Sequence, residues 1–223
     1  MGAPLRFAHR AMARLVLLLR HGQADFDHGR LAGRTPGVHL SERGREEARA
    51  LAERLRPVRL NAIYSSPLER CLQTAEAVAD GRRLDVHVEE GVKEVDFGSW
   101  QGRPYKTLAK TSIWRQVQLV PSQASFPGGE SVRDLQERCV DAVERIRTRH
   151  GKGIVAVASH ADAIKVTAAH YLGMHLDLFQ RIVIPTASVT AIAFGDGFPR
   201  ILRLGDTGSF DEFAPPKRTG KRS

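Results

Sequence analysis

Two histidines and two arginines in this sequence could together carry out chemistry on a phosphate group. Arg20 and His21 directly follow a short apolar run, and His160 directly follows a second one. Arg70 lies in the first turn of a predicted helix, where backbone N–H groups favour an anion. Two guanidinium groups and a second imidazole around a nucleophilic imidazole suit phosphoryl transfer through a phosphohistidine, because the cations hold the phosphate oxygens while one histidine attacks. This chemistry requires no metal ion, and we expect no cofactor.

Two predicted buried strands would bring these residues to one edge of a sheet. Residues 15–19 form an apolar run that is long enough for a buried strand and too short for a core helix, and residues 154–159 form the second such run. Ligands of open α/β sheets bind in the crevice beyond the carboxyl ends of the strands. Because Gly22 has no side chain, we expect it to allow a close approach of backbone and ligand there.

Helix and strand patterns alternate along the rest of the chain. The further predicted strands are residues 61–65, 86–88, 188–194 and 200–204, and the predicted helices are residues 42–56, 66–80, 131–151 and 161–172. Ser66 and Glu69 should form a capping box at the start of the second helix, with Pro67 at its first position. Residues 103–127 show no clear pattern beyond one or two short helices. The alternation predicts an α/β fold with a mostly parallel sheet between helices.

The positive charge of the chain is concentrated at its two ends. Of the net charge of +9, three arginines lie in residues 1–14 and four lysines and arginines lie in residues 214–223, with no acidic residue in either segment. The part between them has no basic stripe interleaved with aromatic residues, so we expect no nucleic-acid partner. We predict a single domain over residues 14–211, a disordered extension over residues 1–13 and a disordered basic tail over residues 212–223.

The lengths of the apolar runs and the spacing of the cysteines indicate the cellular compartment. No wholly apolar run exceeds five residues, which is too short for a membrane span or for the core of a signal peptide. Cys71 and Cys139 are far apart and form no paired motif, so free thiols in a reducing compartment are expected. We therefore predict a cytoplasmic protein whose partner is a small phosphorylated metabolite; the sequence leaves a homodimer open.

A series of motifs resembles the histidine phosphatase superfamily, the phosphoglycerate mutase-like proteins. In the family's order these are LRHGQ at 19–23, LSERGR at 40–45, SSPLER at 65–70, QTA at 73–75, ExxFGxWxG at 94–102, GES at 129–131 and SH at 159–160. The resemblance spans nearly all of residues 14–205 and implies a three-layer αβα sandwich. It implies that His21 is the phosphorylated nucleophile and Glu94 the proton donor to the leaving group. Arg20, Arg70 and His160 would form the phosphate pocket.

Other positions are candidates for lesser roles or depart from the family pattern. Gln23 and Arg34 are candidate substrate contacts, and the stretches 31–38 and 173–181 resemble a bacterial branch labelled phosphomutase-like. Asp27 stands where many members carry Asn, and its carboxylate would repel a phosphate unless it points away or meets Arg30 or Arg34.

Two other acidic residues have different candidate roles. Glu130, in the motif at 129–131, could equally be a first-turn acid that stabilises the dipole of the following helix, and Asp162 is the next candidate for the proton donor after Glu94. Phe97 and Trp100 are expected in the core.

Three functions follow from these residues, and the first is favoured. It is a metal-independent phosphatase that hydrolyses a small phosphomonoester. The second is a phosphoglycerate mutase-type phosphomutase, although the Leu-Asn-Lys run and the longer insertion that mark the mutases are missing after residue 102. The third is a non-catalytic phosphate-binding module, which would not need to keep both a nucleophile and an acid.

Overall fold

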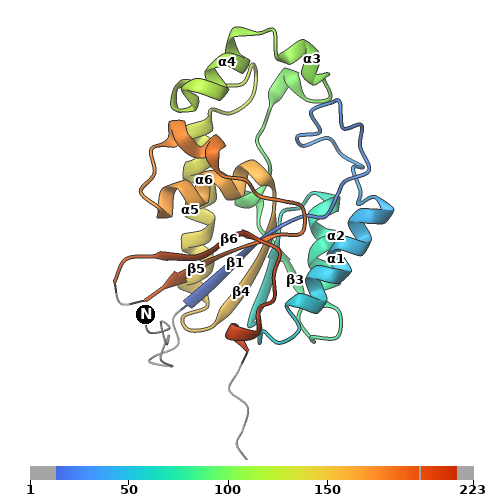
Figure 1. Ribbon diagram of the computed structural model, residues 1–223, viewed down its shortest axis with the longest axis vertical. Coiled ribbons are helices and arrows are strands. Elements are labelled where there is room, and N and C mark those ends of the chain that lie inside the picture. Colours follow the sequence, from blue (N-terminus) through green and yellow to red (C-terminus); the bar gives the residue numbers. More distant parts are fainter. Residues whose placement is uncertain (1–13, 196, 215–223) are drawn as a thin grey trace, which may run out of the picture.

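A six-stranded sheet between two layers of helices forms the body of the protein (Figure 1). The computed structural model describes residues 14–195 and 197–214. The strands follow one another in the sheet as β3 (Val86–Val88), β2 (Ala62–Ser65), β4 (Ile154–Ser159), β1 (Arg14–Arg20), β5 (Val189–Phe194) and β6 (Arg200–Asp206). The first four are mutually parallel, and β5 runs antiparallel to both of its neighbours, β1 and β6. The expected α/β class with a mostly parallel sheet is confirmed.

The two helical layers cover opposite faces of the sheet. Helices α1 (Glu42–Arg54) and α2 (Glu69–Ala79) contact one face, and α5 (Val132–Arg149) and α6 (Ala161–Tyr171) contact the other (Figure 1). The three-layer αβα arrangement is thereby confirmed.

Strand β1 lies at the centre because both of its faces are apolar. Leu15, Leu17 and Leu19 belong to the core with α1 and α2, while Val16 and Leu18 belong to the core with α5 and α6. All five side chains are buried. Each buried leucine stabilises the fold by about 1.5–3 kcal/mol, so this strand could not move to a sheet edge without a large loss of stability.

The unpatterned stretch 103–127 forms short helices above the sheet. They are α3 (Tyr105–Leu108), α4 (Ser112–Leu119) and the 3-10 turn η3 (Pro121–Gln123). The other 3-10 turns are η1 (Glu90–Val92), η2 (Gly98–Trp100), η4 (Leu176–Arg181) and η5 (Asp211–Phe213). Phe97 and Trp100 are buried in the core as expected.

The start of α2 differs from the predicted capping box. The helix begins at Glu69 after Leu68, which makes no side-chain cap. The hydroxyl of Ser66 lies 2.8 Å from Nε2 of His160 instead. The local sequence pattern was misleading here because a partner distant in the chain competes for the serine. The capping box of α5, from Ser131 to Asp134, is present as predicted.

The carboxyl-terminal boundary of the domain lies beyond the predicted residue 211. Phe213 in η5 packs against the core, and its ring lies 5.7 Å from that of the buried Phe210. The predicted tail therefore starts too early, while residues 1–13 and 215–223 lie outside the described residues. Within the described part of the chain, none of the helices has the length and apolarity needed to cross a membrane.

Candidate active site

The register of the parallel strands places the two candidate histidines at the same level. Arg20 at the end of β1 pairs with Ser159 at the end of β4, so His21 and His160 follow at one edge of the sheet. Their rings lie edge to face with centroids 5.2 Å apart. Arg70 reaches the same edge from the first turn of α2.

His21 is buried, and its contacts fix the orientation of the ring. Nδ1 lies 2.7 Å from the carbonyl oxygen of Gly22, and Nε2 accepts a hydrogen bond of 3.2 Å from Nε of Arg70. Because a carbonyl accepts and a guanidinium donates, we assign the proton of the neutral ring to Nδ1 and a lone pair to Nε2. Burial, with Arg70 and Arg20 adding to it, lowers the pKa of His21 to about 3. The ring is therefore neutral at pH 7, and Nε2 is the unprotonated nitrogen that could act as a nucleophile.

His160 is held by a polar group on each ring nitrogen. Nδ1 lies 3.1 Å from Nη2 of Arg70, and Nε2 lies 2.8 Å from the hydroxyl of Ser66. The first contact makes Nδ1 the acceptor, so the neutral ring donates from Nε2 to the serine. Burial lowers the pKa of His160 well below its usual value. Ser66 is thus a positioning residue that the sequence pattern assigned to a helix cap.

Two guanidinium groups present donors that fit a phosphate. In residues 14–195 and 197–214, the buried side-chain polar atoms without a hydrogen-bond partner are Nε of Arg20, Nη1 of Arg70 and Oε2 of Glu69. Arg20 donates to the carbonyl of Ile184 through Nη1, and Arg70 donates to the carbonyl of Gly33 through Nη2. Each arginine is therefore anchored on one side and keeps a further donor, and an anion is the ligand that such donors hold best.

Glu94 lies half-buried in the segment after η1, and its carboxyl group accepts a hydrogen bond of 3.0 Å from the N–H of Val95. Burial, together with the charge of Asp162, raises the pKa of Glu94 to about 7, although Arg70 and Arg20 oppose the shift. A carboxyl group with this pKa can both give and take a proton near neutral pH. Its location beside Arg20 and Arg70 fits the role of acid.

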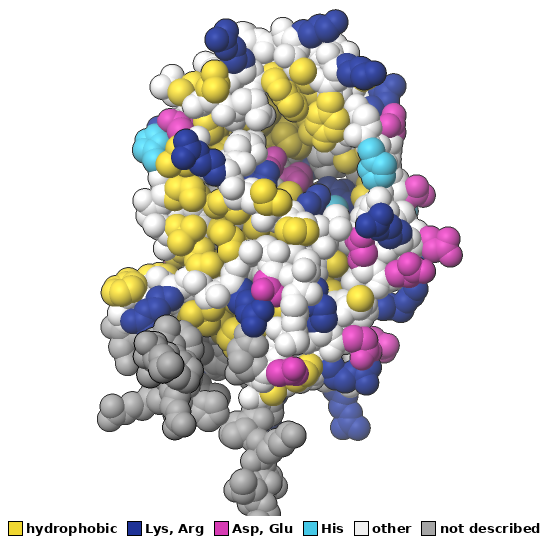
Figure 2. Space-filling view, viewed as in Figure 1, with side chains coloured by type: hydrophobic (Ala, Val, Ile, Leu, Met, Phe, Trp, Pro, Cys, Tyr) yellow, Lys and Arg dark blue, Asp and Glu magenta, His cyan; other side chains and the backbone are white. Residues whose placement is uncertain are grey.

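The molecular surface has a hollow on one face. Figure 2 shows it below α3 and α4, with basic, acidic and histidine side chains inside and hydrophobic side chains along its upper margin. Among the residues that the structure describes, no group of three or more His, Cys, Asp or Glu side chains could hold a metal ion.

Comparisons with known proteins agree with this arrangement. The sequence model of the histidine phosphatase superfamily (branch 1) matches residues 16–207. The chain belongs to the histidine phosphatase superfamily. It is 31% identical over 203 residues to phosphoserine phosphatase 1 of Hydrogenobacter thermophilus, covering 89% of this chain and 95% of that protein. It is 28% identical over 193 residues to the 2,3-bisphosphoglycerate-dependent phosphoglycerate mutase of Thermoplasma acidophilum, covering 86% and 92%.

A solved structure shows the same fold. Bacillus stearothermophilus YhfR superposes with a TM-score of 0.83 at 29% sequence identity, covering 88% of this chain and 98% of that one. The expected family is confirmed, and this histidine phosphatase is an enzyme of the phosphatase type, as predicted.

The two candidate substrate contacts of this histidine phosphatase are tied to protein groups. The side chain of Gln23 accepts from the hydroxyl of Ser41 at 3.1 Å. Arg34 donates through Nε to the carbonyl of Glu94 at 2.8 Å, and its other nitrogens bond Asp96 and Glu130. Arg34 thus holds the segment that carries Glu94, a role that the sequence analysis missed.

The structure adds to three further expectations. Asp27 pairs with Arg30 at 3.3 Å, one of the two arrangements expected to relieve its repulsion of a phosphate. Gly22 is required by packing, because a Cβ there would lie 2.3 Å from the carbonyl oxygen of Gly44 in α1; the approach of a ligand at this glycine stays a prediction. The alternative that Glu130 is a first-turn acid of α5 does not hold. This residue precedes α5 and pairs with Arg34 and with Arg138, and no local pattern indicated either partner.

Proposed function

We propose that this histidine phosphatase hydrolyses a small phosphomonoester through a phosphohistidine at His21, without a metal ion. The observation that carries the proposal is the orientation of the buried ring. The Nδ1–H group donates to the carbonyl of Gly22, so Nε2 carries the lone pair, which accepts from Nε of Arg70 at the edge of the sheet. A nucleophile needs this combination of an unprotonated nitrogen and nearby cations to attack a phosphate dianion.

The first step transfers the phosphoryl group to the enzyme. Nε2 of His21 attacks phosphorus, the N–P bond forms and the ester P–O bond breaks. The unpaired donors of Arg20 and Arg70 hold the phosphate oxygens while charge shifts to the leaving oxygen, and His160 contributes by positioning Arg70. Protonated Glu94 gives its proton to that oxygen, so the product leaves as a neutral alcohol.

The second step releases phosphate. The carboxylate of Glu94, which has just lost its proton, takes one from a water molecule as that water attacks phosphorus. The N–P bond breaks, inorganic phosphate leaves, and His21 and Glu94 return to their starting protonation states. One carboxyl group with a pKa near neutrality serves both steps.

Phosphoserine is the first substrate to test, because a relative at 31% identity over 95% of its own length carries the name phosphoserine phosphatase 1. A panel of phosphorylated metabolites assayed for phosphate release identifies the substrate. We place the activity in the cytoplasm, since both cysteines are free and buried and such thiols suit a reducing compartment.

The second candidate is a phosphomutase, and the similarity to the Thermoplasma acidophilum mutase favours it. A mutase must retain its product until the phosphoryl group is returned to another hydroxyl. With 3-phosphoglycerate and a bisphosphoglycerate primer, we expect phosphate release to exceed the formation of 2-phosphoglycerate. The reverse ratio would replace the phosphatase proposal with the mutase.

The direct test of the proposal is to trap the intermediate. Incubation with a phosphomonoester followed by a denaturing quench should leave an acid-labile phosphate on the peptide that contains His21. His21→Ala should lose both the label and the turnover. Full turnover in this variant would overturn the phosphohistidine scheme.

A further inference from the structure

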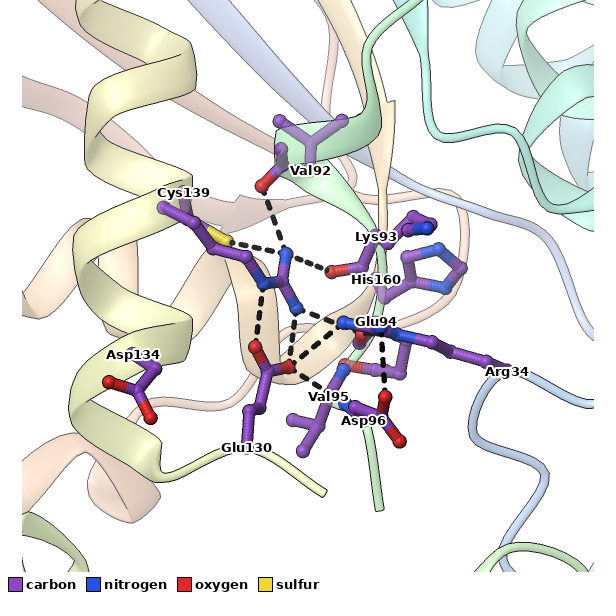
Figure 3. A network of polar contacts seen from close by, with 12 residues as sticks. Arg34, Val92, Lys93, Glu94, Val95, Asp96, Glu130, Asp134, Cys139 and His160 are labelled. Atoms are coloured by element: carbon purple, nitrogen blue, oxygen red, sulfur yellow. Dashed lines mark hydrogen bonds and ion pairs between the residues drawn. The ribbon is translucent and has the colours of Figure 1, made fainter. Parts of the chain in front are cut away.

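We infer that Glu130, acting through Arg34 and Arg138, is a positioning residue for the proton donor Glu94 (Figure 3). The inference rests on the proposed function, because it assumes that Glu94 is the acid. It assigns to Glu130 a role in the reaction without any contact with the substrate.

The backbone of Glu94 is held from two sides. Its carbonyl oxygen accepts from Nε of Arg34 at 2.8 Å and from Nη2 of Arg138 at 2.9 Å. Arg138 also donates through Nη1 to the carbonyls of Gly91 and Lys93, both at 2.9 Å. Figure 3 shows Arg34 on one side of Glu94 and Glu130 on the other. Charge-assisted bonds are about twice as strong as neutral ones, so the segment 91–94 is fixed firmly.

Glu130 holds both arginines in place. Its Oε1 accepts from Nη2 of Arg138 at 2.6 Å, from Nη2 of Arg34 at 3.1 Å and from the N–H of Asp96 at 2.7 Å. Its Oε2 accepts from Nε of Arg138 at 2.8 Å. The carboxylate is only 13% exposed, so these bonds are little screened by solvent. One acidic side chain thus connects α5, the loop before it and the segment on both sides of Glu94.

The same group of contacts reaches the phosphate pocket. Arg70 donates to the carbonyl of Gly33 at 2.7 Å, and the next residue, Arg34, donates to Glu94. The stretch 33–34 therefore joins the arginine that contacts His21 to the segment that carries the acid. Glu130 stabilises this connection through Arg34.

Backbone anchoring matters because the carboxyl group of Glu94 has a local partner. It bonds to the N–H of Val95, the next residue, which cannot fix the carboxyl group relative to the sheet. A general acid must reach the leaving oxygen within about 2.6–3.2 Å, and a misplacement of about 1 Å can cost about 10²-fold in rate. The position of Glu94 therefore depends on the arginines and on Glu130.

The test compares substrates with poor and good leaving groups. Glu130→Gln removes the charge and one of the two acceptor oxygens. In single-turnover formation of the phosphohistidine, we expect it to slow an alkyl phosphate such as phosphoserine by about 10–100-fold. A nitrophenyl phosphate should change less than about threefold, because its leaving group needs no proton. A purely structural role would slow both substrates equally.

A second variant and a matched control complete the experiment. Arg34→Lys removes the Nε donor to Glu94 and leaves the pair of Glu130 with Arg138. We expect the same selective slowing of the alkyl phosphate. This variant tests the inference if Glu130→Gln does not fold. Glu144→Gln is the control, because Glu144 also pairs with an arginine of α5, Arg147, and bonds Tyr171 without contacting the segment 91–94. It should leave both rates unchanged.

The double variant Glu94→Gln/Glu130→Gln separates the inference from the proposed function. If Glu130 acts through Glu94, its substitution should add less than about twofold to the loss caused by Glu94→Gln alone. Additive losses, equal losses for both substrates, or no loss would overturn the inference and leave the role of Glu94 intact. If Glu94→Gln itself shows no preference for the leaving group, the acid assignment fails and the inference fails with it.

Discussion

Nε of Arg70 lies 3.2 Å from Nε2 of His21 and donates to it. The side chain that we propose as a phosphate contact therefore also keeps the proposed nucleophile in its neutral form, because a cation at this distance opposes protonation of the ring. Burial is the larger cause, and together they lower the pKa of His21 to about 3. The site thus has its nucleophile ready before substrate arrives.

The lowered pKa of His21 predicts a loss of stability in acid. An unfolded chain protonates this histidine below about pH 6.5, whereas the folded protein resists protonation down to about pH 3. The unfolded state then binds more protons, so the free energy of unfolding falls as pH decreases between these values, by a few kcal/mol for a buried group. Urea unfolding at several pH values between 7 and 4.5 measures this fall. His21→Asn should flatten the curve, and two parallel curves would contradict the prediction.

Replacement of Arg70 should reduce activity strongly. Arg70→Lys keeps the charge but cannot contact His21, His160 and the carbonyl of Gly33 at once. We expect kcat/KM to fall by about 10²–10³, the usual loss on removing a donor to the transition state. Binding of inorganic phosphate should weaken in the same variant. The control is Arg43→Lys, because Arg43 is exposed on α1 and pairs there with Glu47. A fall in kcat/KM of more than about twofold in this control would count against the interpretation.

The parts of the fold that sequence predicted are those set by local pattern. Residues 15–19 and 154–159 are apolar runs of strand length, and they form the paired central strands whose ends carry His21 and His160. Ser131 caps α5 as expected because its partner, Asp134, lies one turn away. Glu94 is different, since only the family resemblance singled it out from other acidic residues.

What sequence could not predict are contacts between distant segments. Ser66 bonds His160, which lies 94 residues further along the chain, instead of capping a helix. Glu130 bonds Arg34, which lies 96 residues earlier. No spacing rule relates such positions, because they meet only once the sheet has formed. A plausible local role hid the real partner in both cases.

The close approach of the loop at Gly22 and Gln23 to Gly44 predicts that a larger side chain at Gly44 destabilises the protein. A Cβ on Gly44 would lie 1.9 Å from the carbonyl oxygen of Gln23, so α1 would have to move away from the loop that carries His21. Gly44→Ala should therefore destabilise the protein by about 1–3 kcal/mol, the usual cost of overpacking. Gly195→Ala serves as the control, since a Cβ there meets no atom within 4 Å. Equal thermal stability of the two variants would refute this account.

The pKa of Glu94 predicts how the rate depends on pH for substrates with poor leaving groups. Burial is the main cause that raises this pKa to about 7, and the negative charge of Asp162 adds to it. Glu94 is thus protonated below about pH 7 and can act as an acid, and it becomes the carboxylate above that pH. For an alkyl phosphate, kcat/KM should fall about tenfold per pH unit above pH 7.

Two comparisons assign this pH dependence to Glu94. A nitrophenyl phosphate should show no such fall in single-turnover phosphorylation of His21, because its leaving oxygen needs no proton. Glu94→Gln should slow the alkyl ester by about 10²–10⁴ and abolish the fall, since the amide does not titrate. Asp162→Asn removes the neighbouring negative charge, so the pKa of Glu94 should decrease and the fall should begin at lower pH. If the Glu94→Gln profile keeps its alkaline fall, another group is the acid, and Asp162 is then the next residue to replace.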